Sequence, residues 1–197
     1  MSEIQKGDSE IIRRRAALER AIAGGRSVGW LHRLWSRFVK TRDGDRCLNC
    51  GQKDGIQAHH VMRRTLVPFA GLELGNGISL CRPCHKLVHA MFNGRPNPAL
   101  PMGAAQGDDQ EEWSFLFGIL MEDATKRGLV HDELYFLSDE LLHFSVAYQG
   151  YEPLLEAVAD GEFSRLRFMH EIWRAMPEHF YVDLASELGA ELLAAGQ

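Results

Sequence analysis

The four cysteines of the chain form two pairs with the same spacing. Cys47 and Cys50 make the first Cys-x-x-Cys pair, Cys81 and Cys84 make the second, and the sequence has no other cysteine. A two-residue gap lets both thiolates of a pair face one ion, and two such pairs supply the four sulfur ligands of a tetrahedral zinc site. The alternatives are four unrelated reduced thiols, or two disulfides in a secreted protein. The paired spacing and a start without a signal peptide favour structural Zn²⁺.

Histidines lie between and directly after the cysteine pairs. His59 and His60 are adjacent in the 30-residue segment that separates the pairs, and neighbouring side chains of an extended strand point to opposite faces, so we expect different roles for them. His85 and His89 are four residues apart and share one face of the helix that RPCHKLVHAMF predicts. Taken singly, a chance pair on a polar turn or a solvated helix face would explain them. Together, inside a zinc-bound segment, they indicate a second site.

The order and spacing of these residues resemble the HNH endonucleases, in the branch that carries a four-cysteine zinc. The resemblance covers about residues 46 to 92, and the rest of the chain resembles no family that we recognise. It implies a ββα-metal fold, in which a hairpin carries the histidine pair and a helix closes on the metal. The matching positions are Cys47-x-x-Cys50, Ala58-His59-His60-Val61, Asn76 and Leu80-Cys81-x-x-Cys84-His85-x-x-x-His89.

The same resemblance implies a role for each polar residue of the motif. His60 would be the general base that takes a proton from the attacking water, and a neutral imidazole suits that task at pH 7. His59 and His85 would bind a catalytic divalent metal, Mg²⁺, Mn²⁺, Ni²⁺ or Zn²⁺, of which imidazole favours the last three. His89 would complete that site or merely flank it. Asn76 would tie the loop backbone and orient the base.

Charge is divided sharply along the chain. Residues 1–95 carry a net formal charge of +9 and residues 96–197 a net charge of −14, which together give −5. A basic region around a nuclease motif indicates DNA as a partner, because Lys and Arg release counterions from phosphates, although solvated faces are the simpler explanation of charge runs. We expect Arg63 and Arg64 to clamp phosphates, unless they form a solvated hairpin end. Arg82 and Lys86 are further nucleic-acid-binding candidates.

Helices are expected on both sides of this segment. The fold class is therefore mainly α with a small α+β module, divided into a basic helical region (1–45), the HNH module (46–95), a Pro/Gly-rich linker (96–110) and an acidic helical bundle (111–197). Apolar periodicity and capping signals predict helices at 9–22 and 27–40, and further helical segments at 111–128, 131–150, 152–161, 162–176 and 177–196. The histidines of the acidic half have no ligand-like spacing and are expected at the surface or at caps.

These observations lead to a hypothesis and two alternatives. We expect a cytoplasmic HNH endonuclease that hydrolyses DNA phosphodiester bonds, in a phage or defence context by resemblance. The first alternative is a zinc-bearing nucleic-acid-binding or adaptor module with little cleavage. The second is a scaffold whose acidic helices carry the main role. Those helices would bind a protein partner, form a homodimer or restrain DNA binding. No apolar run approaches the roughly 20 residues of a membrane span.

Overall fold

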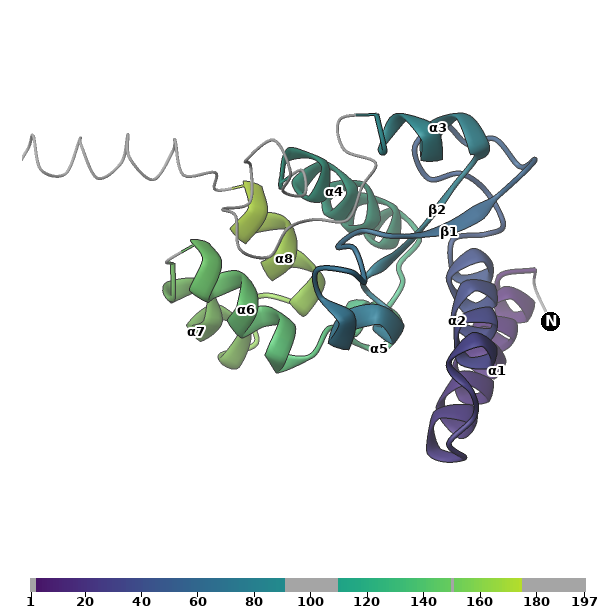
Figure 1. Ribbon diagram of the computed structural model, residues 1–197, viewed down its shortest axis with the longest axis horizontal. Coiled ribbons are helices and arrows are strands. Elements are labelled where there is room, and N and C mark those ends of the chain that lie inside the picture. The colour runs from purple at the N-terminus through teal and green to yellow at the C-terminus, as the bar shows by residue number, and fades with distance from the viewer. Residues whose placement is uncertain (1–2, 91–109, 150, 175–197) are drawn as a thin grey trace, which may run out of the picture.

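Two helices open the chain in the computed structural model, which describes residues 3–90, 110–149 and 151–174. Helix α1 (Glu3–Ala23) and helix α2 (Val28–Arg42) pack side by side (Figure 1). The second begins after Ser27, as predicted. The first begins at Glu3, six residues before the predicted start at Ser9. The predicted start was too late, because Glu3, Gln5 and Lys6 favour a helix and Ser9 is accommodated within it.

A β-hairpin follows, and it carries the motif residues. Strand β1 (Gln57–His60) pairs antiparallel with strand β2 (Gly77–Leu80), with His60 opposite Gly77. The 3-10 helix η1 (Pro68–Leu72) lies in the connection, and helix α3 (Arg82–Leu87) follows β2 directly. Helix α2 crosses the hairpin, where Gly77 makes room for it. A Cβ there would lie 2.6 Å from atoms of both Trp35 and Val39.

The C-terminal part is helical, which confirms a mainly α chain with a small two-stranded sheet. Its elements are α4 (Gln110–Lys126), α5 (His131–Leu134), α6 (Asp139–Gln149), α7 (Pro153–Ala159) and α8 (Arg165–Arg174). The single helix expected at 131–150 is two helices instead. Ser138 breaks it, because its backbone N–H and its hydroxyl both donate to the Glu73 carboxylate. Nearly all of the predicted linker and the helix expected at 177–196 lie outside the described residues.

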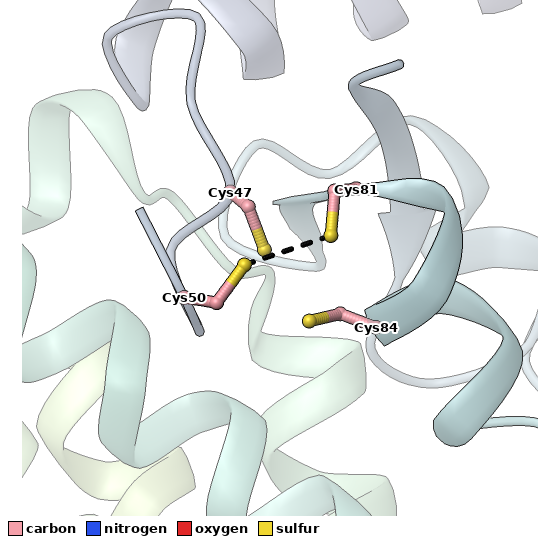
Figure 2. A group of neighbouring side chains, drawn as sticks. All are labelled: Cys47, Cys50, Cys81 and Cys84. Carbon is pink, nitrogen blue, oxygen red and sulfur yellow. Dashed lines mark hydrogen bonds between the residues drawn. The ribbon is translucent and has the colours of Figure 1, made fainter. Parts of the chain in front are cut away.

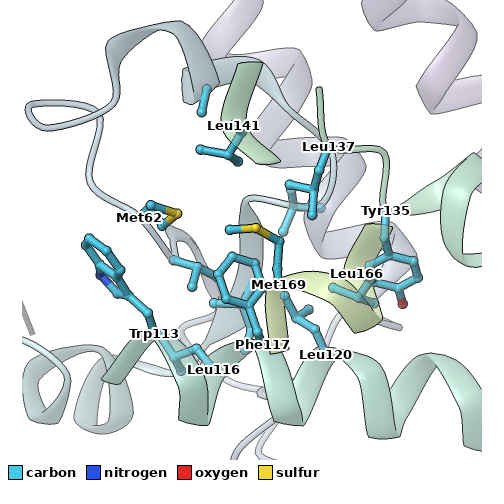
Figure 3. Close-up of a cluster of buried hydrophobic side chains, with 14 of the residues drawn as sticks. Met62, Trp113, Leu116, Phe117, Leu120, Tyr135, Leu137, Leu141, Leu166 and Met169 are labelled. Carbon is cyan, nitrogen blue, oxygen red and sulfur yellow. The ribbon is translucent and has the colours of Figure 1, made fainter. Parts of the chain in front are cut away.

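One hydrophobic core joins the described elements from α1 to α8. In Figure 1 the hairpin lies between the α1–α2 pair and the C-terminal helices. Met62, just after β1, is buried among side chains of the C-terminal helices, near Trp113 and Met169 (Figure 3). The core therefore fixes the hairpin from both sides.

Among the described residues, no helix has the length and apolar content that crossing a membrane requires.

A buried ion pair at the end of α2 fastens the hairpin to that helix. The Arg42 guanidinium donates to the Asp43 carboxylate at 2.8 Å, to the Leu74 carbonyl at 2.6 Å and to the Gly77 carbonyl at 2.5 Å. Asp43 also accepts the backbone N–H of Ser79 at 2.8 Å. Burial alone would lower the pKa of Arg42, but the adjacent Asp43 carboxylate raises it, so the guanidinium stays charged.

Candidate metal centres

The four cysteines gather at one point, from both ends of the 30-residue segment (Figure 2). Their sulfur atoms all lie within 4.8 Å of one another, and Cys50 Sγ is 3.6 Å from Cys81 Sγ. Two sulfurs bound tetrahedrally to zinc at about 2.3 Å are about 3.8 Å apart. The cluster therefore has the ligands and the spacing to hold a zinc ion, as the sequence predicted.

Local backbone geometry brings the cysteines of each pair together. Gly51 adopts a φ of 78°, a left-handed conformation that favours glycine, and its N–H donates to the Cys47 carbonyl at 2.8 Å. Cys81 precedes α3, whose first turn carries Cys84. Burial alone would raise the pKa of Cys47, but N–H groups of Cys81 and Cys50 outweigh it and lower that pKa to about 7. This thiol is therefore prepared to bind metal as a thiolate.

A second cluster consists of three histidines, His59, His85 and His89, and is called the three-histidine site below. One ring nitrogen of each lies within 4.8 Å of the others. The His59 ring centroid is 5.0 Å from both partners, which are 4.7 Å from each other. Helix α3 ends at Leu87, earlier than predicted, so His89 is not helical. A turn with the His89 N–H on the Lys86 carbonyl still keeps it beside His85.

The three-histidine site suits a divalent cation. Burial, and next His85 and His89, lower the pKa of His59 to about 2, and burial lowers the pKa of His85 as well. The rings are therefore neutral near pH 7 and have lone pairs to donate. His89 Nδ1 is buried without a hydrogen-bond partner among the described residues. A set of three imidazoles favours Zn²⁺, Ni²⁺ or Mn²⁺ over Mg²⁺, which prefers oxygen ligands.

His60 lies beside this cluster in a different environment. Its ring stacks on Trp35 with centroids 4.0 Å apart and planes 8° from parallel. Its Nε2 is 3.0 Å from the carbonyl oxygen of Gly71. A neutral ring that donates Nε2–H to this carbonyl keeps its lone pair on Nδ1. Burial lowers the pKa of His60 to about 4, so the ring is neutral at pH 7.

Asn76 is fully buried and fixes the loop that follows β1. Its Oδ1 accepts the N–H of Met62 at 2.8 Å. Its Nδ2 donates to the carbonyls of Met62 at 3.0 Å and Ala70 at 3.1 Å. Ala70 precedes Gly71, which contacts His60. Asn76 therefore supports the loop on which the His60 contact depends.

One pocket, with a volume of about 280 Å³, borders both the three-histidine site and His60. Among the predicted phosphate contacts, the half-buried Arg63 and the exposed Arg64 line it. Arg82 and Lys86 are exposed on α3 and do not line it. The full lining is Ala58, His59, His60, Arg63, Arg64, Thr65, His85 and His89. The pocket therefore places the three-histidine site, the neutral His60 and two cations within one small region, and no cysteine is among its lining residues.

Two neighbours of the site were not predicted as part of it. Trp35 lies on α2, within the helix predicted at 27–40, and no local pattern pairs it with His60. Glu112 lies near the start of the helix predicted at 111–128, and its Oε1 lies 3.7 Å from His59 Nε2. Both pairs are distant in sequence, so only the packing of α2 and α4 reveals them.

The histidines of the C-terminal half behave as ordinary polar residues where they are described. His131 Nδ1 is 2.9 Å from the Ser164 hydroxyl, His143 is exposed, and His170 Nδ1 is 3.3 Å from the Ser114 carbonyl. None of them belongs to a ligand cluster among the described residues. His179 lies outside those residues.

Two features of the structure bear on the expected resemblance to the HNH endonucleases. A four-cysteine cluster that could hold zinc and a small α+β module are both compatible with an HNH-like zinc fold. Comparison with family models, curated proteins and solved structures finds no match for this chain. The assignment of function therefore depends on the chemistry of the clustered residues.

Proposed function

We propose that this protein is a metal-dependent HNH-type endonuclease that hydrolyses phosphodiester bonds in DNA. One observation carries the proposal: the three-histidine site, His60 and the cations Arg63 and Arg64 border a single pocket. A divalent ion in the three-histidine site would act as a Lewis acid on the phosphate oxygens. The cysteine zinc would do no chemistry, because four sulfur ligands close its coordination shell.

His60 is assigned the role of general base. Its Nδ1 accepts a proton from water while the water oxygen bonds to phosphorus, the bond from phosphorus to the 3′ oxygen breaks, and the leaving 3′ oxygen takes up a proton from solvent. The HNH resemblance implies that the products carry a 5′-phosphate and a 3′-hydroxyl. Stacking on Trp35 and the contact with Gly71 hold the ring in one orientation. Such positioning is what makes a general base effective.

Binding of the nucleic acid is assigned to the basic residues around the pocket. Arg63 and Arg64 would contact the phosphate next to the scissile bond, because they line the same cavity as His60. The exposed Arg82 and Lys86 would extend this contact along α3. Each such phosphate contact steepens the dependence of affinity on salt.

Plasmid relaxation by purified protein tests the proposal. The protein is treated with a chelator mild enough to leave the cysteine zinc, and then receives Mg²⁺, Mn²⁺, Ni²⁺ or Zn²⁺ separately. Wild type should convert supercoiled DNA to nicked or linear DNA only with added metal, and His60→Ala should not. The matched control is His143→Ala, which removes an exposed histidine of α6 and should cleave like wild type. Equal cleavage by His60→Ala would remove His60 as the base.

A DNA-binding module without cleavage is the second candidate, and one observation favours it. General bases work best with a pKa near the operating pH, whereas burial places the pKa of His60 at about 4. This hypothesis predicts that wild type and His60→Ala retard DNA equally in gels and that neither nicks DNA with any of the ions.

The ratio of nicked to linear DNA produced by an active protein would report whether the acidic helices pair two copies, since a dimer would place two sites on two strands.

A further inference from the structure

A carboxylate from the C-terminal helices reaches the three-histidine site. Glu112 lies in the first turn of α4, and its Oε1 is 3.7 Å from His59 Nε2. The side chains of His59 and Glu112 are 5 % and 10 % exposed, so little water surrounds this contact. A nearby buried carboxylate is a strong acceptor for an imidazole N–H.

The contact places Glu112 beside the metal ligands and not among them. Among the described residues, the candidate ligand atoms that gather within 4.8 Å belong to the three histidines alone. His59 Nε2 is buried and has no hydrogen-bond partner there. A neutral imidazole has one N–H and one lone pair, so a ring that donates from Nε2 offers Nδ1 to an ion.

We propose that Glu112 is a positioning residue of the metal centre, which accepts a hydrogen bond from His59 Nε2–H and so presents Nδ1 to the ion. This inference deepens the proposed function and rests on the metal site within it. A separation of 3.7 Å is longer than a hydrogen bond, and we expect it to contract when metal is bound. Metal-bound histidines usually donate their other N–H to such a group, which fixes the tautomer and the ring orientation.

The surroundings of Glu112 hold it in place. Trp113, the next residue, is fully buried and packs edge-on against Trp173 of α8, with ring centroids 4.8 Å apart. Further along α4, Asp123 pairs with Arg46, just before the first cysteine pair. The Trp113 contact fixes α4 against α8, and the Asp123–Arg46 pair joins α4 to the segment before the first cysteine pair, so the C-terminal helices hold Glu112 beside the three-histidine site.

Calorimetric titration with Ni²⁺ tests this role without any DNA. The full-length, zinc-replete protein should bind one Ni²⁺ in addition to its cysteine zinc, and His85→Ala should abolish that binding. Glu112→Ala should weaken the Ni²⁺ affinity by roughly 10- to 100-fold, the range typical of lost partners to metal ligands. Glu112→Gln should lose less, because its amide oxygen still accepts a hydrogen bond. The matched control, Glu111→Ala, removes the exposed neighbouring acid and should leave the affinity unchanged.

Two results would overturn the assignment. Wild-type Ni²⁺ affinity in Glu112→Ala would show that the carboxylate does not act on the site. An equal loss in Glu112→Gln and Glu112→Ala would replace positioning through His59 by direct ligation of the ion. Zinc content and melting temperature identify a variant that fails to fold, and the nearly isosteric Glu112→Gln keeps the test decisive in that case.

The calorimetry also separates this inference from the proposed nuclease activity. If wild type binds Ni²⁺ with the expected dependence on Glu112 but cuts no DNA, the nuclease proposal fails and the role of Glu112 stands. If wild type cuts DNA while both Glu112 variants keep full Ni²⁺ affinity, the role of Glu112 fails alone. If wild type binds no second ion, both fail.

Discussion

Replacing Arg42 by methionine should strongly destabilise the protein although it touches neither metal cluster. The change strips the donor from the carbonyls of the half-buried Leu74 and the buried Gly77, and a buried acceptor left unpaired costs about 1–3 kcal/mol. It also leaves the Asp43 carboxylate buried without its cation, although the Ser79 N–H still binds it. Breaking a buried pair in this way costs about 3–5 kcal/mol. Because these terms overlap, we expect a total loss of about 5 kcal/mol.

Urea unfolding followed by circular dichroism, in buffer with zinc, measures this loss. Domains are stable by only about 5–15 kcal/mol, so Arg42→Met should unfold at far lower urea than wild type. The matched control is Arg37→Met, an exposed site on the same helix, where a change within about 0.5 kcal/mol is expected. An Arg42→Met protein within about 1 kcal/mol of wild type would refute the reasoning.

A double substitution tests the cause of the loss. Asp43→Asn removes the stranded charge and keeps an oxygen for the Ser79 N–H. In the Arg42→Met background it should therefore restore stability, whereas in wild type it should reduce it. A coupling energy of about 0.5–3 kcal/mol is expected for such a contacting pair. Additive effects of the two substitutions would mean that the pair is not the source of the stability.

Three other perturbations probe the cysteine cluster, the packing of α2 and the protonation of His60. Cys81→Ser should lower the zinc content measured by atomic absorption and unfold the hairpin; a stable, zinc-replete variant would contradict a structural site. Gly77→Ala should lower stability in thermal melts by about 1–3 kcal/mol, because its Cβ would lie 2.6 Å from α2 side chains. Gly29→Ala, whose Cβ would have nothing within 4 Å, should raise stability by up to about 1 kcal/mol. Equal melting temperatures of the two variants would contradict this packing. The folded pKa of His60, about 4, lies below its unfolded value near 6.5, so its stabilisation is full above pH 6.5 and is lost as pH falls towards 4. Between pH 7.5 and pH 5, wild type should lose about 2 kcal/mol more than His60→Gln in urea unfolding, and parallel losses would refute the shift.

Local patterns in the sequence were enough to predict much of the metal-binding region. The cysteine spacing predicted one cluster, and the four sulfurs meet because each pair needs only a tight turn such as that at Gly51. The helix after Cys81 was predicted from the spacing of His85 and His89, whereas the pairing of β1 with β2 was expected from the resemblance to the HNH endonucleases. The catalytic roles of His60 and Asn76 stay predictions, because the structure places these residues but shows no reaction.

Long-range packing is what the sequence did not reveal. Trp35 on His60 and Glu112 beside His59 join residues from separate helices, and periodicity identifies only a buried face, not its partner. The break at Ser138 depends on Glu73, 65 residues earlier in the chain. A single-sequence pattern contains no term for such contacts, so the continuous helix expected at 131–150 was wrong.

The continuous core determines which segment of the chain can be transferred to another protein with its supporting residues. The stretch that resembles the HNH endonucleases is short, yet the residues that support it belong to α2 on one side and α4 on the other. Residues 46–92 transferred alone would carry the candidate metal ligands without the helices that support them. A fragment that keeps both clusters in place would therefore have to include α2 and α4.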